Sequence, residues 1–204
     1  MYNSIFFSFA IDRGGASGEG DEAGPADQAT FASSNADLVG VQRVALTDPE
    51  GLYTLATALV DYRGTRVVAQ SIIPGILQGE QLSSLVYGSV DGGNKMVWNE
   101  TFHERLKTAA DALHVKESVV VDGAGAEHRL CAPVECKGIL GSDNRMYLLD
   151  VVRVAPADPS YTGDQRAGGG FLRWELVDHF VRARAAAAAD AAPPGAPPPP
   201  PPPP

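Results

Sequence analysis

One stretch constrains the fold more than any other: GLYTLATALVDYRGTRVVAQSIIPGIL, residues 51–77. Two apolar, β-branched runs at 53–60 and 66–73 flank a polar segment at 61–65. Such residues favour a pleated, half-buried surface, and Gly64 provides the positive φ that a tight return needs. The Pro-Gly pair that follows ends the second run, because proline has no N–H to give a strand ladder. We therefore predict a β-hairpin close to the centre of a single core.

The length and charge of the chain limit the kinds of protein that it can be. With 204 residues it suits one domain plus tails. A formal net charge of −9 argues against nucleic-acid binding by bulk electrostatics, and leaves room for a local basic patch. No apolar run approaches the roughly 20 residues of a membrane span, and no basic segment precedes the first apolar stretch. With two cysteines, we predict free thiols, no membrane insertion and a cytoplasmic location.

The N-terminal region combines an apolar strand with an acidic segment. IFFSFAI at 5–11 is typical of a strand, which must pair either with the hairpin or with sequence outside this chain. Residues 1–37 carry six acids and one base, and 13–37 contains a single aromatic residue. So few apolar groups cannot offset the entropy of ordering. We predict an edge strand within 1–12 and a disordered acidic loop over 13–37.

The pattern after the hairpin indicates more hairpins around one helix. Phe102, Leu106, Ala109, Ala110 and Leu113 recur at helical spacing. They predict a helix over 100–113, with Asn99 or Thr101 as its cap. The other expected elements are hairpins of 85–90 with 95–98 and of 115–121 with 128–136, a loop at 138–144, a buried strand at 145–154 and a closing helix at 172–184.

These elements define the fold class. Antiparallel β-hairpins packed around a central helix make an α+β domain over 38–184. From residue 185 the sequence becomes an Ala run and then a Pro run, which has nothing to bury. We predict that 185–204 is a disordered, Pro-rich tail. It could serve as a ligand for aromatic-grooved modules, or it could be passive.

Metal and thiol chemistry have weak support in the sequence. His114, His128, Cys131 and Cys136 are metal-ligand types, but no C-x-x-C is present. Cys131 and Cys136 have opposite parity, so on a regular strand they face opposite ways. Neither has a paired base within its own stretch. We predict buried or half-buried thiols, with no metal, no cofactor and no catalytic residue.

Charged residues near apolar runs are the candidates for interaction. Asp150 and Arg153 lie in a run otherwise rich in Leu and Val, so their charges must be paired or sit at the mouth of a strand. A structural ion pair of Asp150 with Arg153, Arg63 or Arg66 is one interpretation. The candidate interaction surface comprises Arg63, Arg66, Lys137, Asp143, Arg145, Asp150 and Arg153.

An alternative assigns nucleotide chemistry to the same residues. In a kinase-like domain, Asp150 at the end of a buried strand would hold magnesium, with Asp143 as a second candidate ligand. Against this, the sequence has no Gly-rich phosphate loop, no VAIK-type lysine and no HRD-type loop.

Several long motifs in a fixed order resemble a known family. They are IFFSFA from Ile5, DYRGTRVVAQSIIPGILQG from Asp61, LVYGSVD from Leu85, WNE from Trp98, PVECKGI from Pro133 and GSDNRMYLLD from Gly141. Together they resemble the Clu domain of the clustered-mitochondria protein family. The resemblance spans about residues 3 to 181 and leaves the acidic loop and the tail outside.

The resemblance implies a non-enzymatic cytosolic protein that maintains the distribution of mitochondria. It also implies partners: mRNAs for nuclear-encoded mitochondrial proteins, and the translation machinery with the initiation factor 3 complex. The C-terminal tetratricopeptide repeats of that family are not evident, since no 34-residue helical period occurs here. The resemblance supplies no catalytic residues.

Overall fold

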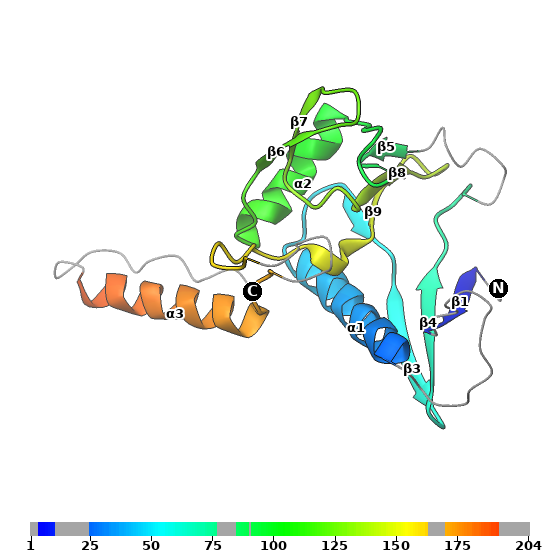
Figure 1. Ribbon diagram of the computed structural model, residues 1–204, viewed down its shortest axis with the longest axis horizontal. Coiled ribbons are helices and arrows are strands. Elements are labelled where there is room, and N and C mark those ends of the chain that lie inside the picture. The colour runs from blue at the N-terminus through cyan, green and yellow to red at the C-terminus, as the bar shows by residue number, and fades with distance from the viewer. Residues whose placement is uncertain (1–3, 11–24, 77–84, 90, 163–169, 192–204) are drawn as a thin grey trace.

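The computed structural model describes residues 4–10, 25–76, 85–89, 91–162 and 170–191. Within these ranges, helices separate runs of mostly antiparallel strands (Figure 1), so the α+β class is confirmed. The elements in chain order are β1 (Ile5–Phe9), α1 (Pro25–Leu46), β2 (Leu52–Thr54), β3 (Thr57–Tyr62), β4 (Thr65–Ser71), β5 (Leu85–Tyr87), α2 (Glu100–Ala112), β6 (Ser118–Val121), β7 (Glu127–Leu130), β8 (Lys137–Leu140), β9 (Met146–Leu149), the 3-10 helix η1 (Val151–Arg153) and α3 (Trp174–Asp190).

β1, β4 and β3 form an antiparallel sheet in that order. β3 and β4 meet at a tight turn made by Arg63 and Gly64, whose φ angles are 50° and 79°. Two consecutive positive φ angles are what a type I′ hairpin turn requires. The predicted hairpin is therefore confirmed. The first strand of the hairpin begins at Thr57 and not at the expected residue 53. Tyr53 lies in β2, which belongs to another sheet.

The expectation that this hairpin lies at the centre of the core is wrong. α1 covers one face of the three-stranded sheet, where Arg66 and Gln70 reach its side chains. The pairing of Phe7 with Ala69 and of Phe9 with Val67 places both aromatic rings on the opposite face. We call this the outer face. Its exposed apolar residues are Ile5, Phe7, Phe9, Val60 and Tyr62, with exposed fractions between 37% and 66%.

The core lies instead between α2 and a second sheet, in the order β2-β9-β8-β5. β2 runs parallel to β9, and the other neighbours are antiparallel. The predicted helix is confirmed as α2, with the Asn99 side chain accepting a hydrogen bond from the Phe102 N–H at 2.9 Å. Its apolar face buries Phe102 and Leu106 against Tyr87 and Leu148, and each of these four side chains is at most 1% exposed.

A glycine inside β8 explains one wrong prediction. The expected loop at 138–144 contains a strand in its first three residues. A Cβ on Gly138 would lie 2.6 Å from Cζ of Phe102 and 2.7 Å from Cβ of Tyr87. The glycine is therefore required by close packing of two aromatic side chains on the strand, and it does not mark a turn.

The strand expected at 145–154 ends early. β9 stops at Leu149, Asp150 takes a left-handed φ of 58°, and Val151–Arg153 forms η1. Val151 is buried beneath α1, and a Cβ on Gly40 of that helix would lie 2.3 Å from the Val151 oxygen. The backbone turns out of the sheet at this point and packs against a helix.

The disordered loop expected over 13–37 is wrong for residues 25–37, which form the first half of α1; residues 13–24 lie outside the described ranges. Pro25 at the first helical position and the alanines favour a helix. Tertiary packing of Gly40 and Val44 then stabilises it, since Val44 is 1% exposed within the core. The edge strand expected within 1–12 is confirmed as β1 over Ile5–Phe9, with Ile11 outside the described ranges.

The remaining hairpins are partly as expected. β6 and β7 confirm the third one, and the Asp122 side chain holds its turn by accepting from the Ala124 and Ala126 N–H groups. In the second, a single bridge joins Gly88 to Val97, and β5 pairs with β8 instead.

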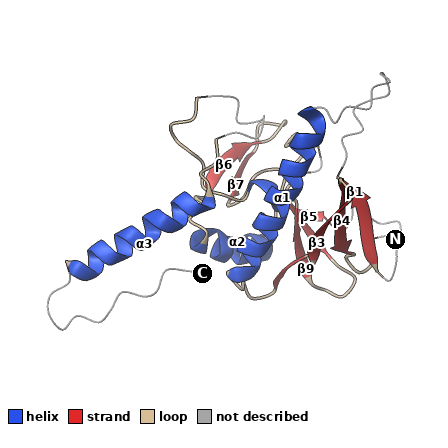
Figure 2. Ribbon diagram, turned by 90° about the horizontal axis from the view of Figure 1, so that it is seen from below, coloured by secondary structure: helices blue, strands red, loops and turns tan. Residues whose placement is uncertain are grey.

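The closing helix is confirmed as α3, and it extends to Asp190. The disordered tail expected from residue 185 is therefore wrong for residues 185–190, which are helical. Residues 192–204 lie outside the described ranges. Figures 1 and 2 show α3 projecting from the body. Its base is held by Arg43 of α1, which bonds both carboxylate oxygens of Asp178 at 2.8 and 3.0 Å and lies 5.0 Å from the Trp174 ring centroid. None of the described helices is long and apolar enough to cross a membrane.

Candidate interaction surface

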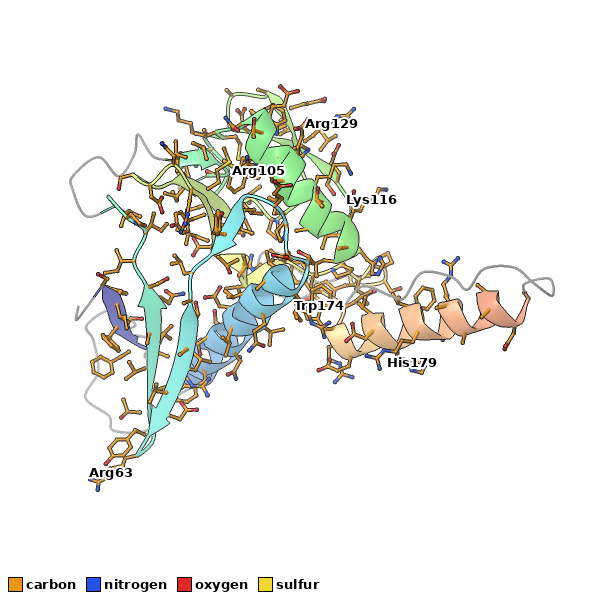
Figure 3. All side chains as sticks on the ribbon, turned by 180° about the vertical axis from the view of Figure 1, so that it is seen from behind. Arg63, Arg105, Lys116, Arg129, Trp174 and His179 are labelled. Atoms are coloured by element: carbon orange, nitrogen blue, oxygen red, sulfur yellow. The ribbon has the colours of Figure 1, made fainter. Side chains whose placement is uncertain are left out.

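The structure places the seven candidate residues in separate regions. Arg63 is at the hairpin tip, and Figure 3 shows it at the opposite end of the molecule from Arg129 and Lys116. Arg66 lies between β4 and α1. The remaining five lie near the strands of the four-stranded sheet, and they are Lys137, Asp143, Arg145, Asp150 and Arg153.

Arg66 is part of an internal network. Its guanidinium bonds both oxygens of Asp61 at 2.6 Å, reaches Asn35 Oδ1 at 2.8 Å and lies 4.4 Å from the Phe31 ring centroid. Hydrogen bonding to Arg66 lowers the pKa of Asp61. These contacts tie α1 to the hairpin, so the side chain stabilises the fold and has little freedom to bind a partner.

Asp150 forms a structural ion pair, and its partner is Lys137 rather than any of the expected arginines. Arg153 is paired with Glu135 at 2.8 Å. Both pairs lie next to η1, and Lys137 and Asp150 come from adjacent elements that the β8–β9 pairing brings together. Opposite charges therefore alternate across this part of the surface.

The nucleotide-binding alternative rests on Asp150 and Asp143. Asp143 accepts a hydrogen bond from the Tyr147 hydroxyl at 2.8 Å. In the part of the chain that the structure describes, no group of three or more His, Cys, Asp and Glu side chains is placed to hold a metal ion. The alternative stays a prediction. An ATP-dependent rise in melting temperature that Asp150→Asn removes would support it, and no shift would exclude it.

The best-defined exposed cluster lies where β2 meets β9. The Arg145 guanidinium carbon is 5.1 Å from the Tyr53 ring centroid, and the Tyr53 and Tyr147 rings are 6.0 Å apart. Tyr53 is 41% exposed, and the Arg145 side chain is 58% exposed. We call Tyr53, Arg145 and Tyr147, with Asp143 behind them, the Arg–Tyr platform.

Hydrogen bonds hold the carboxylate of the platform in its charged form. Burial opposes ionisation of Asp143, but bonds from the Tyr147 hydroxyl and the Arg145 backbone N–H outweigh it, so the pKa of Asp143 is lowered. Burial and then the bond to Asp143 raise the pKa of Tyr147. The Arg145 Nε lies 3.9 Å from Asp143 Oδ2, which orients the guanidinium above Tyr53.

A guanidinium stacked on a tyrosine offers planar groups and a positive charge to a ligand. Nucleobases stack on such surfaces, and phosphates bind arginine. Arg145 and Asp143 were predicted from the sequence, and Tyr53 and Tyr147 were not. The parallel register that sets Tyr53 beside Tyr147 joins segments more than 90 residues apart, and no local pattern signals it.

A second arginine–tyrosine stack lies at the hairpin tip. The Arg63 guanidinium carbon is 5.3 Å from the ring centroid of Tyr62, which is 66% exposed. No acidic side chain is paired with Arg63 among the described residues. This stack is more exposed than the Arg–Tyr platform and has fewer supporting contacts.

The two cysteines are free and buried, as predicted. Burial raises the pKa of Cys131 to about 11, and burial also raises that of Cys136. His103 Nδ1 lies 3.8 Å from the Cys131 sulfur and 3.1 Å from the Tyr87 hydroxyl. The protonated thiols are poor nucleophiles. The contacts of His103 with Cys131 and Tyr87 instead join α2 to the core.

An apolar groove runs along α3. It has a volume of ≈ 640 Å³, and Leu176 and Phe180 on its rim are more than half exposed. The residues that line it are His114, Pro156, Leu172, Leu176, Val177, Phe180, Val181 and Arg184.

Comparison with known proteins gives a consistent result. A family profile described as "Clustered mitochondria" matches residues 1–161. The chain is 53% identical over 159 residues to the "Clustered mitochondria protein" of Arabidopsis thaliana, which covers 78% of this chain and 11% of that protein. It is 40% identical over 201 residues to the human "Clustered mitochondria protein homolog", and the match covers 90% of this chain and 15% of that protein. It is 44% identical to the "Clustered mitochondria protein homolog" of Danio rerio, where the match covers 90% of this chain and 14% of that protein. No solved structure matches it.

Proposed function

Because this chain belongs to the clustered mitochondria family, we propose that it is a non-enzymatic module that acts in the intracellular distribution of mitochondria. The observation that carries the proposal is the match over residues 1–161, with 53% identity to a relative named for that phenotype. The chain spans 11–15% of the relatives compared, so the activity of a whole family protein comes to it only as part of this proposal.

The mode of action that we propose is binding of mRNA for mitochondrial proteins, or of the translation machinery, in the cytoplasm. The Arg–Tyr platform supports the RNA alternative, because Arg145 and Tyr53 are both exposed and stacked. A chain with a net charge of −9 has little bulk attraction for RNA. Contacts at such a local site would therefore depend on stacking as well as on phosphate binding.

Loss of the protein tests the cellular role. Deletion of the gene should cluster the mitochondria, and re-expression should disperse them. Normal mitochondrial distribution in the deletion strain would overturn the proposal.

Ultraviolet crosslinking of the full chain to cellular RNA, across a salt series, tests the mode of action. We expect crosslinks that weaken as salt rises and that fall several-fold in the double variant Tyr53→Ala, Arg145→Ala. The matched control is Phe180→Ala, Arg184→Ala, which removes an arginine–aromatic contact of 5.8 Å on α3. Equal crosslinking in both double variants would remove the platform from the proposal, and no crosslinking of folded wild type would favour protein partners.

A further inference from the structure

β1 has one unpaired edge among the residues that the structure describes. Among the described residues it has one strand neighbour, β4, and the sheet order is β1-β4-β3. The Ala10 N–H donates to the Arg66 oxygen at 3.0 Å, and the Ile72 N–H donates to the Ser4 oxygen at 3.1 Å. Alternate residues of an antiparallel strand bond to the same neighbour. The even-numbered residues therefore bond to β4, and the backbone groups of Ile5, Phe7 and Phe9 point away from it.

The side chains of this edge are apolar and exposed. Ile5 is 37% exposed, Phe6 52%, Phe7 46% and Phe9 60%. Proteins usually protect an edge strand with a charge, a proline or a bulge. IFFSF contains no charge and no proline, and its register with β4 is unbroken. The strand therefore has the properties of a pairing site.

The sequence of β1 is self-complementary in the antiparallel sense. With Phe7 on a two-fold axis, it lies opposite Phe7 of a second copy, and Ile5 lies opposite Phe9. This register uses all the outward backbone N–H and C=O groups of Ile5, Phe7 and Phe9 on both strands. It also places their side chains on one face as aromatic and aliphatic cross-strand pairs, which stabilise sheets.

Charge and area are compatible with such a pair. The chain has a net charge of −9, but no charged side chain lies within Ile5–Phe9, so two copies meet along a neutral edge. A large aromatic side chain has roughly 200 Å² of surface. The exposed parts of the apolar side chains of β1 therefore have a total area of roughly 400 Å². A stable interface buries about 800 Å² on each partner. The area therefore indicates a dimer that forms at high concentration.

We propose that the edge of β1 binds a second copy of this chain, joining two three-stranded sheets into one continuous sheet with a two-fold axis at Phe7. Isologous pairing of one surface with itself is the commonest symmetry of protein dimers. The outer faces of both copies then form one extended apolar surface.

Sedimentation velocity of the full chain over a concentration series tests the dimer. We expect a dimer fraction that rises with concentration and is lost in Phe7→Lys, because a lysine on an edge strand opposes pairing. The matched control is Phe180→Lys on α3, which removes a phenylalanine of similar exposure (57%). Wild type that remains a monomer throughout, or dimers lost in the α3 variant and kept in the β1 variant, would overturn the proposal.

Disulfide trapping tests the register and does not depend on the lysine variant folding. In a hydrogen-bonded antiparallel pair the Cα atoms are about 5.5 Å apart, within the range of a disulfide. Phe7→Cys should form a covalent dimer under mild oxidation, and Ser8→Cys, which lies opposite Phe6 of the second copy, should not. The native cysteines are buried at 1% and 0% exposure. Equal crosslinking of both variants, or none, would overturn the proposed register.

Discussion

The four-stranded sheet and the three-stranded sheet of this protein differ in what covers their faces. The first is packed against α2, and Tyr87, Phe102 and Leu148 within it are at most 1% exposed. The second has α1 on one side, and on the other it exposes Phe7, Phe9 and other apolar residues of the outer face. Similar residue types therefore stabilise the fold in one region and are available to partners in the other.

The largest expected effect lies in the covered region, at Gly88. Its φ is 87°, and a Cβ there would lie 1.9 Å from the Cys136 oxygen. Backbone strain and overpacking together should make Gly88→Ala lose about 3–4 kcal/mol of unfolding free energy. Gly92→Ala is the control, since Gly92 has a φ of 70° and open space around it; it should lose about 1–2 kcal/mol. Urea unfolding measures both, and equal losses would contradict the close contact.

Truncating one apolar side chain in each region tests the comparison directly. Leu106 is 1% exposed, so Leu106→Ala should cost about 2–4 kcal/mol of stability. Phe9 is 60% exposed, so Phe9→Ala should change the stability of the monomer by less than about 0.5 kcal/mol. Urea unfolding at low protein concentration gives both values. A loss at Phe9 as large as that at Leu106 would mean that the outer face is covered.

A smaller effect is expected where α3 joins the covered region. Arg43→Ala removes the bonds to Asp178 and the contact with Trp174, and should cost about 1 kcal/mol. Hydrogen exchange should accelerate in α3 and remain unchanged in α2. Arg182→Ala, an exposed arginine on α3 itself, is the control. Faster exchange in both variants would show that Arg43 does not anchor the helix.

The smallest effect depends on pH and involves Asp37 of α1. Burial, and then the charge of Asp150, raise the pKa of Asp37 above its ordinary value of 3.8. A raised pKa means that the charged form is disfavoured in the fold, so stability falls as pH rises through it. Asp37→Asn should therefore stabilise the protein at pH 7, by less than about 1 kcal/mol, and the gain should vanish below pH 3.8. Melting temperatures measured from pH 3 to 7 check this, and a loss at pH 7 would contradict it.

The sequence predicted elements whose signals are local. Gly64 within the polar segment 61–65 marked the hairpin turn, and the spacing of Phe102, Leu106 and Ala109 marked α2. Prediction from the sequence failed where contacts between distant residues determine the structure. Gly138 resembled a loop residue because the aromatic side chains that occupy the space of its missing Cβ come from β5 and α2.

Contacts between distant parts of the chain also account for the wrong predictions in α1 and in the site. The first half of α1 has few apolar residues, and its stability comes from packing around Gly40 and Val44 that the sequence pattern does not reveal. The charged candidates could be named from their neighbours in sequence. Their pairing, such as Lys137 with Asp150, depends on the sheet register and was assigned to the wrong partners.

The pairing of β1 with β4 also has a consequence for synthesis. Ile5 lies opposite Ser71, so this apolar strand leaves the ribosome 66 residues before its partner. At a synthesis rate of about 5–20 residues per second, β1 lacks its partner strand for roughly 3–13 s. During that interval IFFSF is a ready substrate for chaperones that hold nascent chains. The length of time for which this strand needs protection is therefore set by the distance along the chain between two strands that pair in the folded protein.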